Sequence, residues 1–273
     1  MTLEFAPVAT VAGKEFWDRI RSLWVLAIAV LFTVFALAIA YFGGAQQGAV
    51  GFRSIEFTIA SLVSLVIYLI PLIALLLGFD AIVGERERGS LDLLLSMPIT
   101  RLELLLGKFL GLAAALAFST VAGFGLVAMV LAGRLNLGGL SAYAGFMASS
   151  ILLGVSFLSI AVLISVLASD RTRASGLSIA VWFFFVLMFD LLLLGALVVS
   201  GGRVGGAVFP YLLLLNPTDV FRVLNVHALE EVGSLYGLAT VFPPELAHQG
   251  LLYGVMLAWC VLPLMLAAWR FRR

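Results

Sequence analysis

Charged residues are scarce in this chain: they make up 11% of its 273 residues, whereas 63% of the residues are hydrophobic. Soluble domains carry roughly 25% charged residues, and no soluble fold could bury so large an apolar share. The net charge of +1 gives no reason to expect a nucleic-acid partner. The composition therefore predicts an integral membrane protein.

Cysteine and histidine are also scarce, which limits the chemistry open to the chain. The one cysteine, Cys260, lies in an apolar run, so neither a disulfide framework nor a metal-binding cysteine pair can form. His227 and His248 lie far apart in the sequence, and Met256 and Met265 form no tight thioether cluster. Paired carboxylates in an apolar site and a histidine near a nucleophile are missing too. We therefore expect no metal site, no cofactor and no catalytic residue.

Long apolar runs dominate what is present. Runs of this length must satisfy their own backbone hydrogen bonds in the bilayer, so they are predicted to be helices. The first exceeds the about 7–15 residues of a signal-peptide core, and we expect it to stay in the membrane. The six predicted spans are residues 23–42, 57–79, 105–132, 143–168, 177–200 and 251–269. The expected fold is all-α, a single transmembrane domain over residues 1–273.

The basic residues predict the orientation of these spans. With both termini in the cytoplasm, 12 of the 16 Lys and Arg residues lie on that side, and only Arg53, Arg134, Arg203 and Arg222 lie on the other. Cytoplasmic loops of membrane proteins carry such an excess, and an even number of spans agrees with it. The sequence therefore predicts a multi-pass protein of a bacterial inner membrane.

Residues 13–22 are typical of an amphipathic helix that precedes the first span. Phe16, Trp17, Ile20 and Trp24 are its expected apolar anchors. Such a helix would lie along the cytoplasmic surface of the lipid bilayer. The alternative is a simple continuation of the first span with a charged end.

The largest external segment, residues 201–250, is named here the external lobe. Its apolar stretch around Pro210 is too short to cross the membrane and suits a short or re-entrant helix. Pro217 restricts Asn216 and favours a turn there. We expect this lobe to be the docking surface for an external partner.

A segment between the second and third spans, residues 78–111, reads GFDAIVGERERGSLDLLLSMPITRLELLLGKFLG. Five acidic and four basic residues surround a short apolar helix in it. Gly89 is expected to interrupt the preceding helix, Ser90 to cap the short one, and Pro98 to end it. Thr100 and Glu103 have the spacing of a capping box for the third span.

The predicted course is therefore helix, elbow, short helix, elbow, helix, within a coupling loop at residues 80–107. Leu91, Leu94 and Leu95 are expected to form an exposed face on the short helix. A rigid elbow with mixed charges and an apolar face suits the transmission of force from a soluble partner. The alternative is a solvated loop.

The stretch ERERGSLDLLLSMPITRLELLLGK resembles the cytoplasmic loop of type-2 ABC transporter permeases. In that family an acidic–basic pair, a Gly-Ser step, a leucine-rich turn and a proline precede the next helix and its Gly-Lys. The resemblance implies that this element contacts a groove of a partner ATPase. The coupling residues it implies are Glu85, Arg86, Glu87, Arg88, Gly89, Ser90, Leu91, Asp92, Leu94, Leu95 and Pro98.

The chain has no phosphate-binding loop of its own, because Gly107-Lys108 lacks a glycine five residues earlier. ATP and Mg would therefore be held by a separate cytoplasmic ATPase subunit. The resemblance also implies two copies of the permease beside two ATPase subunits. It leaves the transported substrate and the direction of transport open.

The stretch LNPTDVFRVL at residues 215–224 further resembles permeases encoded with nitrous oxide reductase maturation genes. That resemblance implies a periplasmic accessory partner at the external lobe and a role in assembling copper–sulfur centres. It implies no metal site in this chain.

Asp190 is a carboxylate near the middle of the fifth span, where a charge on an isolated helix costs about 2.5–3.5 kcal/mol. It should face the bundle or a dimer seam, either as a substrate or proton contact in a pathway or as a protonated or hydrogen-bonded packing residue. No Lys or Arg in the spans is an obvious partner. Two alternatives to the ABC permease remain: a proton-coupled secondary transporter that uses Asp190, and a non-transporting membrane anchor of an assembly complex. Separately, Gly107 and Gly111 form a GxxxG pair that favours close helix packing.

Overall fold

The structure, a computed structural model, describes residues 4–42, 55–131, 137–201, 209–227 and 248–272, which contain helices and no strand. Five of these helical stretches are long and apolar enough to cross a membrane. They are Thr58–Glu87, Arg101–Val130, Gly139–Leu167, Arg171–Val199 and Gln249–Arg272. The predicted all-α membrane class is confirmed at this level. The first predicted span forms α2 (Leu23–Phe42), of which Ala27–Ile39 ranks as a shorter apolar helix.

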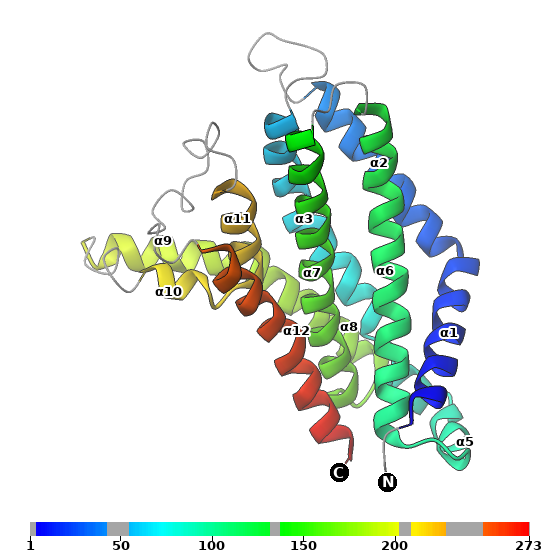
Figure 1. The fold of residues 1–273 in the computed structure, drawn as a ribbon. Helices are drawn as coiled ribbons and strands as arrows, with labels where there is room; N and C mark the ends of the chain where they lie inside the picture. Colours follow the sequence, from blue (N-terminus) through cyan, green and yellow to red (C-terminus); the bar gives the residue numbers. More distant parts are fainter. Residues whose placement is uncertain (1–3, 43–54, 132–136, 202–208, 228–247, 273) are drawn as a thin grey trace.

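The bundle is built around α7 (Leu137–Leu167), which packs against α3 (Ile55–Gly78), α6 (Arg101–Leu131) and α12 (Gln249–Arg272). Figure 1 shows these helices running along one another, with α12 tilted across α7. Hydroxyl groups of α7 face this interior rather than lipid. The buried serines are Ser149, Ser150, Ser156, Ser159 and Ser165.

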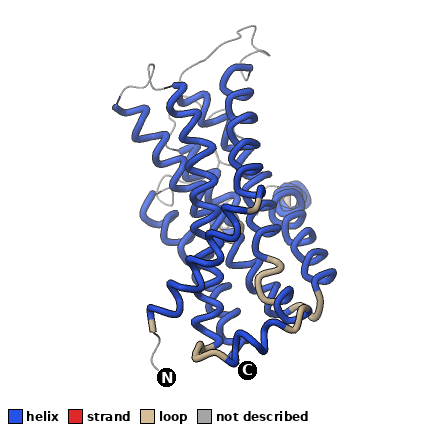
Figure 2. Tube along the Cα trace, turned by 90° about the vertical axis from the view of Figure 1, so that its right-hand side faces the viewer, coloured by secondary structure: helices blue, strands red, loops and turns tan. Residues whose placement is uncertain are grey.

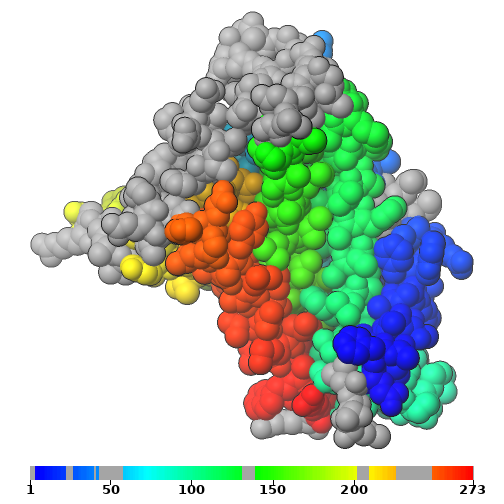
Figure 3. Space-filling model, in the orientation of Figure 1, coloured from blue at the N-terminus to red at the C-terminus, as the bar shows by residue number. Residues whose placement is uncertain are grey.

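The N-terminal helix α1 spans Phe5–Arg21, so it begins well before the expected residue 13. It ends at Ser22, whose backbone is extended, so it is a helix separate from α2. It packs along α6 (Figure 3), where a Cβ on Gly107 would lie 2.6 Å from the Cβ of Val11. The expected close packing at the GxxxG pair is thus confirmed, and α1 is the helix that uses it.

Of the expected anchors of this helix, Trp17 is 56% exposed, and Phe16 packs edge-on against Phe118 of α6. Ile20 is half-buried, and the side chain of Trp24 lies outside the described residues.

The fifth span is one continuous helix with a local change of pitch: α8 (Arg171–Phe183), a π-helical turn η3 (Phe184–Met188) and α9 (Phe189–Val199). The described part of the external lobe adds α10 (Phe209–Leu213) and α11 (Pro217–His227). The expected short helix at Pro210 and the turn at Asn216 are therefore confirmed.

Figure 1 shows that α1 begins and α12 ends at the same end of the bundle as the short helix α5 (Ser90–Ser96), and Figure 2 shows both ends of the chain at that end from a second side. Two hydrogen bonds agree with this placement. Glu4 N–H donates to Glu103 Oε1 over 2.8 Å, and Arg101 Nη1 donates to the Phe271 carbonyl over 3.2 Å. The starts of α1 and α6 and the end of α12 therefore meet.

Candidate functional sites at the elbow and on α11

The predicted elbow is present between α3 and α6. It consists of α4 (Val83–Glu87), a break at Gly89, and α5 (Ser90–Ser96), after which the backbone at Met97 is extended. Gly89 has φ +70°, a left-handed conformation that glycine adopts without a steric penalty. The expected order of helix, elbow, short helix, elbow, helix is confirmed.

The capping of the two helices differs from the expectation in one respect. Thr100 and Glu103 form the predicted capping box, with Thr100 N–H 2.8 Å from Glu103 Oε2 and Glu103 N–H 3.2 Å from Thr100 Oγ1. The prediction that Ser90 caps α5 was wrong. Gly89 occupies the cap position, and the Ser90 hydroxyl instead turns back to the carboxylate and carbonyl of Glu85.

A buried lysine fixes α4 to the rest of the bundle. Lys108 Nζ lies 3.0 Å from Glu85 Oε1 and 3.2 Å from Glu15 Oε2, and its side chain is 8% exposed. We call Lys108, Glu15 and Glu85 the lysine junction. It joins α1, α4 and α6 through charge-assisted hydrogen bonds, which are the stronger kind.

The other polar groups of α4 attach it to α7 and α8. Arg86 Nη1 donates to the Ala168 carbonyl over 2.9 Å, and Glu87 accepts the Arg171 N–H over 2.7 Å. The Arg171 guanidinium in turn lies 2.7 Å from Asp80. These contacts satisfy orphan backbone groups at the end of α7 and the start of α8. The elbow is therefore held as a rigid extension of four helices.

The apolar side of α5 differs from the one expected. Leu91, Leu94 and Leu95 share a face, but they are half-buried, and the prediction that they form the exposed face was wrong. The exposed apolar side chains are Leu93, at 66%, and Met97, at 49%. A helical wheel identifies a face but not which face its own bundle covers, and so Leu93 was missed.

Two clefts adjoin the elbow. One of about 560 Å³ lies between α1 and the elbow, with Lys14, Asp18 and Arg88 among its lining residues. Another, of about 400 Å³, lies between α5 and the end of α12 and includes Arg101 and Arg270. Both have room for side chains of another protein beside the elbow.

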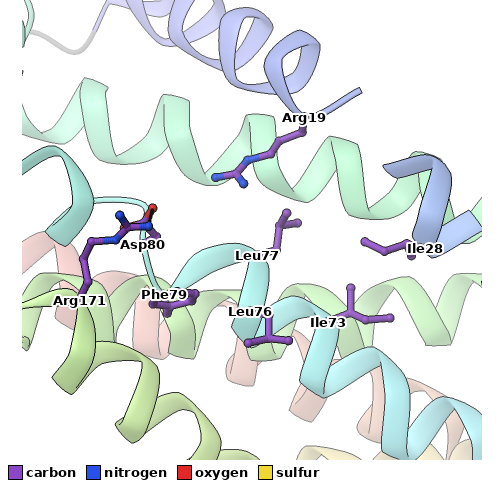
Figure 4. Close-up of a pocket in the computed structure, with 8 residues that line it drawn as sticks. All are labelled: Arg19, Ile28, Ile73, Leu76, Leu77, Phe79, Asp80 and Arg171. Atoms are coloured by element: carbon purple, nitrogen blue, oxygen red, sulfur yellow. Dashed lines mark hydrogen bonds and ion pairs between the residues drawn. The ribbon is translucent and has the colours of Figure 1, made fainter. Parts of the chain in front are cut away.

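A smaller pocket of about 210 Å³ lies where α1, α2, α3 and α8 meet. Figure 4 shows Asp80 and Arg171 pointing toward one another at one end of it, with Leu77 and Ile73 on its apolar wall. Ligand pockets are usually about 300–1,000 Å³. This pocket is smaller than that, and we assign no substrate to it.

Asp190 has a basic partner that the sequence did not suggest. Arg222 of α11 lies between two carboxylates, with Nη2 3.0 Å from Asp190 Oδ2 and Nη1 2.5 Å from Asp219 Oδ1. Asp190 Oδ1 is buried, and no described residue donates a hydrogen bond to it. We call Asp190, Asp219 and Arg222 the arginine cluster. It joins α11 to the fifth span.

The start of α11 also contacts the π-helical turn. Asn216 Nδ2 donates to the Phe185 carbonyl over 2.9 Å and to Asp219 Oδ2 over 2.9 Å, while Thr218 Oγ1 reaches the same carbonyl at 3.3 Å. A π-turn disturbs the helical hydrogen-bond ladder and is frequent at functional sites. One hydrogen-bonded group of the LNPTDVFR stretch therefore includes Asn216, Thr218, Asp219 and Arg222. The Asp219–Arg222 spacing of three residues was the one sequence signal of a charged pair on this helix.

Metal ligation was not expected, and among the residues the structure describes no group of three or more His, Cys, Asp or Glu side chains could hold an ion. Cys260 is buried beside Ser156, at 3.2 Å. The side chain of His227 lies outside the described residues.

Comparison with known proteins identifies the family. Residues 9–273 match the family model described as "ABC-2 family transporter protein". The chain is 46% identical to the probable ABC transporter permease protein NosY of Stutzerimonas stutzeri, over 97% of this chain and 98% of that protein. It is 44% identical to the protein of the same name from Pseudomonas aeruginosa, with the same coverage of both. With the elbow in the predicted place and the match spanning nearly the whole chain, the protein belongs to the ABC-2 transporter family.

Proposed function

We propose that the elbow is the element through which a cytoplasmic ATPase moves this permease, and that Leu93 and Met97 are its contact face. As an ABC-2 family member the chain is a multi-pass membrane permease that carries no ATPase activity, so ATP is hydrolysed in a partner subunit.

The observation that supports it is that the elbow has two kinds of residues: some contact the chain's own helices, and others are exposed. Glu85, Arg86 and Glu87 are engaged by the chain's own helices through the lysine junction, the end of α7 and the start of α8. Leu93 and Met97 project from the same rigid unit and are exposed. Interface anchors are commonly apolar side chains that enter a partner's pocket. The anchored residues would then pass a push on α5 directly to four helices.

The arrangement in the membrane is proposed as follows. α2, with 20 residues, rises about 30 Å, enough for a sixth crossing. α1 lies at the cytoplasmic surface of the lipid bilayer, and both termini are cytoplasmic. This agrees with the placement of the start of α1 and the end of α12 beside the elbow.

We further propose that two copies of the chain work together, because each copy offers one elbow and an ATPase dimer presents two sites. In the most apolar stretch of the helix Arg171–Val199, 11% of the residues are buried. A broad apolar side of this helix is therefore left for a second copy or for lipid.

The likeness to the two NosY permeases supports a role in nitrous oxide reductase maturation. In that role the motion would drive export of a substrate or reach a periplasmic accessory protein at the external lobe. Of that lobe, residues 202–208 and 228–247 lie outside the described part.

The test is co-purification of the permease with its cognate ATPase from a common expression. A Leu93→Asp/Met97→Asp variant should recover at least about tenfold less ATPase, as expected when contact hot spots are lost, with an unchanged unfolding temperature. Leu93→Met keeps an apolar contact, and Thr172→Asp places one aspartate on the exposed start of α8, away from the contact face. Both should retain the ATPase. Full recovery by the double variant would exclude this contact face.

A further inference from the structure

We infer that the arginine cluster is a proton-binding site, in which Asp190 and Asp219 share one proton while Arg222 neutralises the remaining negative charge. The first observation is the charge count. Two carboxylates meet one guanidinium, so the cluster carries a net charge of −1 when both are ionised. Asp219 is 1% exposed, and burying an uncompensated charge is expensive, so such groups commonly neutralise by taking up a proton.

The second observation is an oxygen without a donor. Asp190 Oδ1 is buried and accepts no hydrogen bond from the residues that the structure describes, although Oδ2 of the same carboxylate is paired with Arg222. Arg222 holds the two carboxylates beside each other, because each of its two terminal nitrogens pairs with one of them. Carboxylates that share a site in this way tend to retain one proton between them. A proton taken from water would either turn the unpaired oxygen of Asp190 into a donor or supply it with a donor from Asp219.

The surroundings offer no alternative cation among the described residues. α11 packs against α3, α7, α12 and η3. The basic side chains described on these helices, Arg270 and Arg272, lie at the far end of α12, where Arg101 contacts Phe271. Their other titratable residues are Tyr68, Tyr143, Tyr253, Cys260 and Glu56, and the side chain of Glu56 lies outside the described part. Burial, reinforced by the Asp190 carboxylate, raises the pKa of Asp219 above its ordinary value, against the opposing effect of Arg222.

A consequence follows for the docking of α11. A raised pKa in the docked state means that docking is favoured while the proton is bound and weakens as the pH rises through that pKa. The site therefore makes the contact between the external lobe and the fifth span sensitive to pH. It requires no passage of protons across the membrane.

The test is infrared spectroscopy of the reconstituted wild-type protein, with all aspartates labelled with ¹³C, titrated from about pH 5 to about pH 9. We expect a carboxylic-acid carbonyl band that shifts with the label and disappears as the pH rises. The band should be lost in Asp190→Asn and in Asp219→Asn, and retained in Asp170→Asn, which changes a carboxylate outside the cluster whose side chain is 39% exposed.

The wild-type measurement stands even if a variant fails to fold. Absence of an aspartic-acid band in labelled wild-type protein would overturn the inference. So would a band that persists in folded Asp190→Asn. A band that falls at constant pH when Na⁺ or K⁺ is added would also overturn it, because the cluster would then take a metal cation in place of the proton.

Discussion

Lys108 and Arg222 each hold two carboxylates, but their surroundings differ. At the lysine junction the surplus negative charge is shared, since Glu15 also pairs with Arg19 at 3.5 Å and Glu85 accepts the Ser90 hydroxyl. At the arginine cluster no further cation is found among the described residues, and one oxygen of Asp190 lacks a donor. One cationic side chain between two carboxylates can therefore form a stable ion-pair junction at Lys108 and a proton-binding site at Arg222.

The largest effect should come from removing the cation of the fixed joint. Lys108→Met leaves Glu15 and Glu85 facing each other, and breaking a buried ion pair costs about 3–5 kcal/mol. We expect a much lower unfolding temperature in detergent. Lys14→Met removes an exposed lysine from the neighbouring helix and should change little. Equal stability of the two variants would mean that the junction does not hold the elbow.

A second substitution tests whether geometry matters at the arginine cluster. Arg222→Lys keeps the charge, but an ammonium cannot reproduce the planar fork that contacts Asp190 and Asp219 through separate nitrogens. Losing one hydrogen bond to a charged group costs about 1.5–3 kcal/mol. The expected result is a lower unfolding temperature for Arg222→Lys. No change would show that charge alone suffices.

Much of the fold followed from the sequence because membrane helices are set by local chemistry. The first span was expected at 23–42 and α2 is Leu23–Phe42. The elbow was predictable for a similar reason: the left-handed turn at Gly89 and the Thr100–Glu103 capping box are short-range features.

The partners of the charged residues were not predictable in the same way. Lys108 meets Glu15 and Arg222 meets Asp190 across gaps of 93 and 32 positions, and each contact depends on how helices dock. The π-turn at Phe184–Met188 has no pattern of its own in an apolar run. Exposure of Leu93 likewise depends on which side of α5 the bundle covers.

A third substitution tests whether the lysine junction depends on the close packing of α1 against α6, a contact that the arginine cluster does not share. The lysine junction needs α1 close to α6, and a Cβ on Gly107 would lie 2.6 Å from Val11 Cβ and 3.0 Å from the Val8 carbonyl oxygen. Overpacking lowers the free energy of unfolding by about 1–3 kcal/mol. Replacing glycine by alanine within a helix raises it by up to about 1 kcal/mol, because alanine has the higher helix propensity. Gly107→Ala should therefore lose on the order of 1 kcal/mol.

The matched control is Gly125→Ala in the same helix, where a Cβ would meet nothing within 4 Å. It should be neutral or slightly stabilising, because only the propensity term acts. A loss equal to that of Gly107→Ala would show that α6 tolerates neither change and that the approach of α1 is not the cause.

The smallest effect should appear at an exposed carboxylate, where the pH dependence runs opposite to that of the arginine cluster. Asp170 caps α8 by accepting the Arg173 N–H over 2.8 Å, and this hydrogen bond holds the pKa of Asp170 below its ordinary value. The cap therefore stabilises the protein above the unfolded-state pKa and is lost as the pH falls through the lower folded-state pKa. For Asp219 the raised pKa gives the reverse: its contribution is present at low pH and is lost as the pH rises.

Asp170→Ala should thus lower the unfolding temperature slightly at neutral pH and not in strong acid. Asp170→Asn should keep the cap at every pH, because asparagine accepts the same hydrogen bond without titrating. Unfolding temperatures of wild type and Asp170→Ala, recorded from acid to neutral pH, would test the prediction. If the difference between the two proteins stayed the same in acid, the stabilisation would come from packing and not from the charged cap.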